Sequence, residues 1–261
     1  PFLAGLASTV RVNGFETDYP GRVTDWRGFR RHDFTLEGLA CVLVEPNVPA
    51  DPERRWFWRA RFFGAFPFVD LALLKRGWHV AHVAVDELYG SPESNRRFDV
   101  LHAFLVSLGF NRKCALAGFS RGGLDSFNWA VKNPGKVSSL YLDNAVCDFK
   151  SWPGGKGRGP GDSASWQRCL AAWGFTEAQA LAFEGNPVDN LKPLADVRIP
   201  LLLVCGDADE VVPPDENSAI VERRYRDLGG DIEIIHKPGA GHHPHSLVDP
   251  QPIVDFILRH R

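Results

Sequence analysis

The sequence of 261 residues predicts an α/β protein whose mostly parallel sheet is flanked by helices on both faces. Short continuous apolar runs recur along the chain, and segments with helical periodicity separate them. Such runs are typical of parallel strands that are buried on both faces. The chain is 44% hydrophobic, which is enough for a sizeable core, and we expect one domain over residues 1–261.

The apolar runs give the expected strands in chain order. Residues 1–35 alternate weakly between apolar and polar side chains, which predicts two antiparallel edge strands with turns at 13–14 and 19–21. We interpret residues 47–58 as a proline-rich, charged connection. The continuous runs predict further strands at 39–44, 80–85, 114–117, 137–142, 201–205 and 232–235.

Helical periodicity fills the intervals between these strands, and most of the periodic segments end at glycine or proline. Residues 146–190 interrupt this alternation with a glycine- and proline-rich stretch and two short helix-like pieces. In a parallel sheet the ligand site lies at the carboxyl ends of the strands. The expected helices are 61–75, 92–108, 124–133, 215–228 and 252–259.

Composition and charge exclude several classes of function. The net charge of −2 and the absence of a basic block argue against nucleic-acid binding. No apolar run is long enough to span a membrane, and no signal peptide follows Pro1. We expect a soluble protein, cytoplasmic or, if an upstream signal has been removed, periplasmic or secreted. The oligomeric state stays open.

The five cysteines show no metal-binding spacing. Cys41, Cys114 and Cys205 lie in apolar runs and are expected to be small buried hydrophobes. Cys147 and Cys169 flank the loop-rich segment, where a disulfide is the less favoured alternative.

The chain is organised around the segment Lys113–Leu124. An apolar run leads into Gly118-Phe-Ser120-Arg-Gly122, and a helical pattern follows. The glycines on either side of Ser120 allow strand and helix to pack closely around a strained turn that exposes the hydroxyl. This strand, turn and helix resemble the nucleophile elbow of the α/β-hydrolase superfamily.

The resemblance implies an acid and a histidine that follow the serine in this order. The segment 206–213, a glycine followed by acidic residues, an apolar pair and proline, resembles the superfamily's acid-bearing loop and implies Asp209 as the acid. We expect Asp207, which lies beside it, to be a turn or cap residue. Asp143 or Asp148, just past the preceding strand, is the competing position.

The loop after the last expected strand carries three histidines within four residues. The superfamily places its base in this loop, usually directly behind a glycine, which favours His242 over His243 and His245. Of His243 and His245, one is expected to pack against or hydrogen-bond to the loop and the other to reach substrate. We expect no metal here, because a divalent site needs further ligands and the spacing is not that of a helix. No cofactor is expected.

The oxyanion hole needs two backbone donors. The first is the N–H of Arg121, directly after the nucleophile. The second is expected from Trp58 or Arg59, although this segment lacks the glycines of the lipase form. Arg59 and Arg121 could instead bind an acidic or hydroxyl-rich substrate, or Arg121 could pair with Asp86 or Glu87.

In α/β-hydrolases the insertion at 146–190 commonly carries the cap that shapes the substrate pocket. Its tryptophans favour a functional lid, in which Trp152 and Trp166 would contact substrate. From about residue 34 onward the chain resembles bacterial α/β-hydrolases associated with polysaccharide breakdown, and less closely dienelactone hydrolases and prolyl-oligopeptidase catalytic domains.

This resemblance implies a serine carboxylesterase that acts on a carbohydrate-linked or other small ester. Tryptophans in the expected pocket loops would suit stacking on sugar faces. The alternatives are a peptidase or a glycan-cleaving hydrolase with the same pocket and, least favoured, a non-catalytic binding protein. The natural substrate and acyl group stay open.

Overall fold

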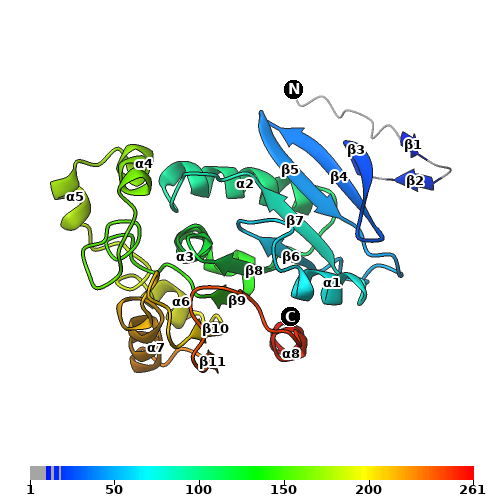
Figure 1. The fold of residues 1–261 in the computed structure, drawn as a ribbon. Helices are drawn as coiled ribbons and strands as arrows, with labels where there is room; N and C mark the ends of the chain where they lie inside the picture. Colours follow the sequence, from blue (N-terminus) through cyan, green and yellow to red (C-terminus); the bar gives the residue numbers. More distant parts are fainter. Residues whose placement is uncertain (1–9, 13–14, 18) are drawn as a thin grey trace.

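The computed structural model describes residues 10–12, 15–17 and 19–261, and its centre is a nine-stranded sheet (Figure 1). The strand order is β11-β10-β9-β8-β6-β7-β5-β4-β3, and β1 and β2 form a separate antiparallel pair. The strands are β1 (Val10–Val12), β2 (Phe15–Thr17), β3 (Arg22–Trp26), β4 (Phe29–Leu36), β5 (Leu39–Val44), β6 (Trp56–Arg59), β7 (His79–Val83), β8 (Cys114–Phe119), β9 (Val137–Asp143), β10 (Leu201–Gly206) and β11 (Ile232–Lys237).

From β11 to β7 all neighbouring strands are parallel, whereas β5, β4 and β3 continue the sheet in antiparallel pairing. The predicted mostly parallel sheet is therefore confirmed. Of the two expected edge strands, the one at 29–34 lies in β4, next to the edge strand β3, whereas the one at 10–12 is β1, which pairs with β2 outside the main sheet. The turn predicted at 13–14 lies outside the described residues.

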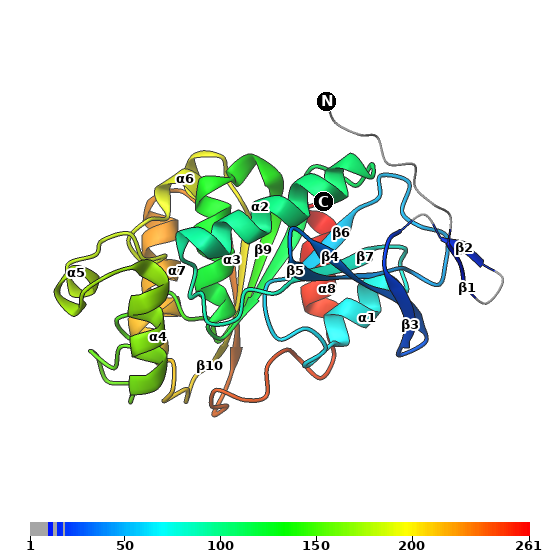
Figure 2. The ribbon, with the colours of Figure 1, turned by 90° about the horizontal axis from the view of Figure 1, so that it is seen from above.

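Helices cover both faces of the sheet (Figures 1 and 2). One apolar cluster joins α2, α3, α6 and α7 to one face, and a second joins α1 and α8 to the other. The α-helices are α1 (Phe68–Leu74), α2 (Pro92–Ser107), α3 (Gly122–Lys132), α4 (Ser163–Trp173), α5 (Glu177–Leu181), α6 (Lys192–Asp196), α7 (Ser218–Asp227) and α8 (Gln251–Arg259). Two short 3₁₀ helices, Pro134–Lys136 and Pro214–Glu216, complete the described elements.

Two predictions about secondary structure, for residues 56–59 and 61–75, are wrong. Strand β6 was expected to be the end of a connection, but its four residues are fully or almost fully buried in the middle of the sheet. The helix predicted over 61–75 begins only at Phe68. Phe62, Gly64 and Phe66 all have positive φ, a backbone conformation that cannot continue a right-handed helix.

Residues 146–190 leave the sheet and form α4 and α5, which lie on the opposite side of the molecule from β3 (Figures 1 and 2). A third apolar cluster, which includes Phe149, Trp166 and Leu170, ties this segment to Tyr89 and Leu124. Each of the five cysteines is buried and has a free thiol, so the disulfide considered between Cys147 and Cys169 is not formed. No helix in the described ranges has the length and apolar character needed to cross a membrane.

Candidate active site

Ser120 lies at the tip of a tight turn between β8 and α3. Its φ of +50° is a left-handed conformation that a residue with a side chain rarely adopts. The glycines around it make this turn possible, since a Cβ on Gly118 would lie 2.7 Å from the carbonyl oxygen of Gly122. A Cβ on Gly123 would lie 2.6 Å from the carbonyl oxygen of Val146. The expected strand, turn and helix are thus present.

The structure brings Ser120, His242 and Asp209 together although they lie far apart in the sequence. The hydroxyl of Ser120 lies 2.9 Å from Nε2 of His242, and Nδ1 of His242 lies 2.7 Å from Oδ2 of Asp209. The other carboxylate oxygen of Asp209 accepts hydrogen bonds from the backbone N–H groups of Val211 and Val212, each at 2.9 Å. Asp209 therefore fixes the ring of His242 so that Nε2 faces the serine.

Asn144, which the sequence analysis missed, connects the loops that carry the acid and the histidine. Its amide oxygen accepts a hydrogen bond from the N–H of Gly206 at 2.7 Å. Its amide nitrogen donates to the carbonyl oxygens of Gly241 at 3.2 Å and His242 at 2.9 Å. An asparagine directly after a buried strand was the available signal. One side chain thereby sets the spacing of Asp209 and His242.

Asp143, the first alternative acid, is engaged with another histidine. Its carboxylate accepts hydrogen bonds from Nδ1 of His245 at 2.9 Å, the N–H of Ser246 at 2.8 Å and the hydroxyl of Tyr141 at 2.7 Å. The amino group of Lys237 lies 3.6 Å away. This second aspartate–histidine pair is buried beside the first.

None of the other acidic and histidine candidates makes a side-chain hydrogen bond to Ser120 in the described part of the chain. Asp148 accepts from the N–H of Lys150, and Asp207 pairs with the exposed His236. His243 is exposed and lines the cavity described below. Partial burial and the neighbouring histidines lower the pKa of His243.

A cavity of about 690 Å³ opens at Ser120. Loops that follow β6, β7, β10 and β11, the turn after β8, and the segment 146–190 form its walls. Its lining residues are Phe62, Ala65, Phe66, Glu87, Ser120, Arg121, Trp152, Gly161, Asp162, Ser165, Arg168, Val211, His242, His243 and His245.

Glu87 organises the charges in this cavity. Nη1 of Arg121 lies 3.1 Å from one of its carboxylate oxygens and Nε of Arg168 lies 2.7 Å from the other. Partial burial opposes ionisation of Glu87, but hydrogen bonds from Tyr89 and Arg168 and the charge of Arg121 outweigh it and lower its pKa. Arg121 also lies over the rings of Phe62 and Trp152. Of the alternatives for Arg121, the pairing with Glu87 is the one present.

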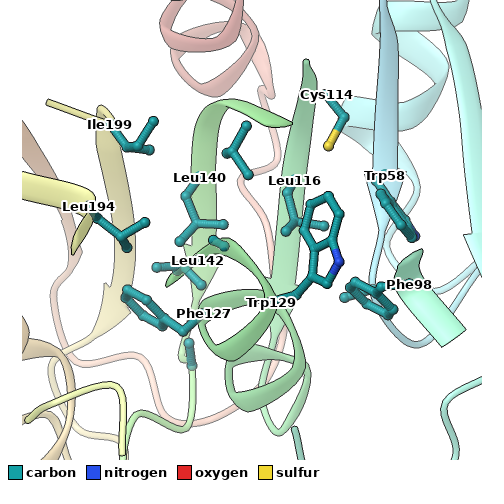
Figure 3. Close-up of a cluster of buried hydrophobic side chains, with 14 of the residues drawn as sticks. Trp58, Phe98, Cys114, Leu116, Phe127, Trp129, Leu140, Leu142, Leu194 and Ile199 are labelled. Atoms are coloured by element: carbon teal, nitrogen blue, oxygen red, sulfur yellow. The ribbon is translucent and has the colours of Figure 1, made fainter. Parts of the chain in front are cut away.

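The expectation that Trp58 or Arg59 supplies the second oxyanion donor is wrong, and so is the alternative that Arg59 binds substrate. Trp58 is fully buried and stacks on Phe98 with ring centroids 4.5 Å apart, on the helix-covered face shown in Figure 3. Both residues belong to β6, whose backbone pairs with β7 on one side and β8 on the other, so their N–H groups lie in the ladder. Neither residue lines the cavity.

Arg59 instead holds a buried ion pair. Its Nη1 lies 3.1 Å from Oδ2 of Asp70, and the two side chains are 1% and 0% exposed. The guanidinium also donates to the carbonyl oxygens of Phe62 and Ala65 and lies 3.9 Å from the ring centroid of Phe119. Arg59 therefore stabilises the loop at Phe62–Ala65, which borders the cavity.

Arg59→Met is expected to lower the free energy of unfolding by about 3–5 kcal/mol, because it leaves the Asp70 charge buried without its partner. Burial raises the pKa of Asp70, and the Arg59 charge opposes that rise. The double variant Arg59→Met/Asp70→Leu should recover most of the loss, since it removes both charges. Urea unfolding measures this, and a single variant as stable as the wild type would contradict the assignment.

Of the two tryptophans expected at the substrate, only Trp152 lines the cavity. Trp166 is 5% exposed and packs against Phe149 within the segment 146–190, so its predicted contact with substrate is wrong. His245 borders the cavity although its side chain is almost fully buried.

The second oxyanion donor was expected from Trp58 or Arg59, but it is the loop after β6 that borders the cavity at Ser120. The N–H of Ala60 bonds to Ala117 and so still belongs to the sheet. Arg61 anchors the loop through the carbonyl oxygen of Val85 at 3.0 Å and the carboxylate of Asp86 at 3.1 Å. Phe62 follows with a φ of +53° and lines the cavity. Sequence reasoning missed this loop because 61–75 was predicted to be helical.

Comparison with known proteins gives similarity at the level of structure. No protein-family model and no curated protein sequence matches the chain. An acylaminoacyl peptidase from Pyrococcus horikoshii has a TM-score of 0.64 at 15% identity, over 87% of this chain and 39% of its own. A puromycin hydrolase has a TM-score of 0.65 at 16% identity, over 88% and 37%.

A putative lipase from Acinetobacter baumannii has a TM-score of 0.57 at 15% identity, and the match covers 89% of this chain and 92% of the lipase. The chain spans less than two-fifths of the length of the peptidase and the puromycin hydrolase. The mostly parallel sheet, the helices on both of its faces and these similarities together show that the chain has the α/β-hydrolase fold.

Proposed function

We propose that this chain is a serine hydrolase that cleaves a small carboxylic ester, with Ser120 as nucleophile, His242 as general base and Asp209 as the acid that orients it. The observation that carries the proposal is the continuous hydrogen-bonded series from Ser120 through His242 to Asp209, at the mouth of a cavity. Each contact is short enough for direct proton transfer or orientation.

In the proposed reaction His242 accepts the Ser120 proton while Oγ attacks the ester carbonyl. The resulting oxyanion is stabilised by the N–H of Arg121 at the start of α3, and we assign the second donor to the N–H of Phe62. Collapse of the tetrahedral intermediate breaks the bond to the alcohol, which leaves with the proton from His242. Water then attacks the acyl-enzyme and gives a proton to His242. The second tetrahedral intermediate breaks its bond to Ser120, whose oxygen takes that proton back from His242 as the acid is released.

The walls of the cavity support a substrate with flat apolar surface and a polar rim. Phe62, Phe66 and Trp152 supply aromatic faces, which suit a sugar ring or an aromatic acyl group. Arg121 and Arg168 stand where hydroxyl or carboxylate groups of the substrate would lie. We therefore favour a carbohydrate-linked ester, and we assign the segment 146–190 as the cap of the cavity.

A peptidase is the second candidate, because the similar structures include acylaminoacyl peptidases. An amide and an ester require the same nucleophile and base, so the triad alone does not separate them. Turnover of p-nitrophenyl acetate without turnover of peptide p-nitroanilides favours the esterase. The opposite preference favours the peptidase. Acetylated, methylated and feruloylated glycans then resolve the natural ester.

Covalent labelling tests the nucleophile. A fluorophosphonate probe should form one adduct, and peptide mass spectrometry should place it on Ser120, because that hydroxyl has His242 within 2.9 Å. Unfolding the protein before labelling should abolish the adduct, since the series of hydrogen bonds is then lost. An adduct on a different serine, or none on the folded protein, would overturn the proposed function.

A further inference from the structure

Three histidine rings face one another beside Ser120. The ring centroids of His242 and His243 lie 4.9 Å apart, those of His242 and His245 5.1 Å, and those of His243 and His245 4.9 Å. The rings are steeply inclined to one another, with interplanar angles of 71°, 82° and 87°. One ligand nitrogen from each ring lies within 4.8 Å of the others.

This triangle has the dimensions of three imidazoles around one tetrahedral ion. With Zn–N distances of about 2.0–2.1 Å and tetrahedral angles, the ring centroids are roughly 5 Å apart and the ligand nitrogens roughly 3.4 Å apart. The centroids already match, and a small turn of the rings brings the nitrogens together. The exposed His243 is free to make the largest turn, because its ring lies at the cavity surface.

Two of the rings are held as metal-binding histidines commonly are. Nδ1 of His242 bonds to Asp209 and Nδ1 of His245 bonds to Asp143, each within 2.9 Å. A carboxylate on Nδ1 fixes the tautomer in which Nε2 presents its lone pair, and it strengthens the ring as a ligand. Ester cleavage by a serine nucleophile needs one aspartate–histidine pair, here Asp209 and His242. The second pair, Asp143 and His245, has no part in the proposed ester cleavage.

Contrary to the expectation drawn from the sequence spacing, we propose that His242, His243 and His245 bind one transition-metal ion of the imidazole-preferring class, with Zn²⁺ as the probe, and that binding inhibits the hydrolase. Three neutral imidazoles leave a fourth position for water or Ser120. The ion takes the lone pair of His242 Nε2, which then no longer accepts the serine proton. The inhibition rests on the proposed function, whereas the binding does not.

Binding is tested on the Ser120→Ala protein, so that the result is independent of catalysis. Co²⁺ should give the visible absorption of a tetrahedral site, and Zn²⁺ should bind at one ion per chain by calorimetry. Adding His243→Gln or His245→Gln should weaken binding by more than about 100-fold. Adding Asp143→Asn should weaken it by about 10–100-fold.

The matched control is His236→Gln, which removes an exposed histidine that also pairs with an aspartate, Asp207. It should leave the affinity unchanged. Circular dichroism melting shows whether each variant is folded. If folded Ser120→Ala protein binds no Co²⁺ or Zn²⁺ at up to millimolar concentration, or if His243→Gln and His236→Gln have equal effects, the metal site is refuted.

Inhibition is tested on the protein with Ser120 intact. Micromolar Zn²⁺ should suppress ester turnover, and EDTA should restore it. Measured against its own zinc-free rate, the His243→Gln variant should resist inhibition by more than about 100-fold, whereas His236→Gln should remain sensitive. Binding to the three histidines without inhibition would overturn the inhibitory role. A protein without esterase activity that still binds Co²⁺ would refute the proposed function alone.

Discussion

Ser120→Ala should lower kcat for p-nitrophenyl acetate by about 10⁴–10⁶-fold, because no other described hydroxyl bonds to His242. The residual rate should approach that of hydrolysis by water in the cavity, with the oxyanion donors still in place. The fold should persist, since the glycines at 118, 122 and 123 make the turn possible. Steady-state kinetics measures the loss, and a thermal melt checks the fold.

Ser139→Ala is the matched control for this prediction. Ser139 is a buried serine on β9, the strand next to the one that carries Ser120, and it does not line the cavity. Its replacement should change kcat less than twofold. If Ser120→Ala retains more than about a tenth of the wild-type rate, Ser120 is not the nucleophile and the proposed mechanism fails.

The features that the sequence revealed are those that depend on local pattern. Apolar runs located β7, β8, β9 and β10 because a buried parallel strand needs apolar side chains on both faces. Shorter or partly exposed apolar runs also located the antiparallel strand β5 and the edge strand β11. The elbow was visible because a strained turn requires glycines at fixed offsets from Ser120. Asp209 and His242 could be named because the loops that carry them resemble the acid-bearing and histidine-bearing loops of the α/β-hydrolase superfamily, in the order that follows its serine.

The missed features depend on partners that are distant in the sequence. Strand β6 was missed because it contains Arg59. A buried charge in a sheet needs a charged partner, here Asp70, and this pairing is not visible in the local sequence. Asn144 resembles an ordinary turn residue until the acid and histidine loops close around it. Tertiary contacts determine the place of β6 and the role of Asn144, and local sequence propensity does not reveal such contacts.

The pairing of His245 with Asp143 shows the same limit in the site itself. The sequence left Asp143 and Asp148 as rivals of Asp209, since all three were expected at or near the ends of strands. The structure gives Asp143 and Asp209 each its own histidine. Only the ring that also reaches Ser120 can act as its base, and this distinction yields the next prediction.

Asp209→Asn should lower kcat for ester hydrolysis by about 10⁴-fold with little change in KM. An amide at this position donates to Nδ1 of His242, which places the proton on Nε2, the atom that must accept from Ser120. The backbone N–H groups of Val211 and Val212 still hold the side-chain oxygen, so the loop should keep its shape. The variant should therefore melt close to the wild type.

Asp143→Asn is the counterpart that separates the two aspartates. Its buried carboxylate accepts hydrogen bonds from Tyr141, His245 and Ser246, with at least one donor at each oxygen. In either orientation, the NH₂ group of an asparagine would therefore face a donor instead of an acceptor. We expect a loss of about 1–3 kcal/mol in the free energy of unfolding and a fall in kcat of less than tenfold. If Asp143→Asn instead gives the 10⁴-fold loss and Asp209→Asn the mild one, the acid and base of the triad are Asp143 and His245, and the assignment of Asp209 and His242 fails.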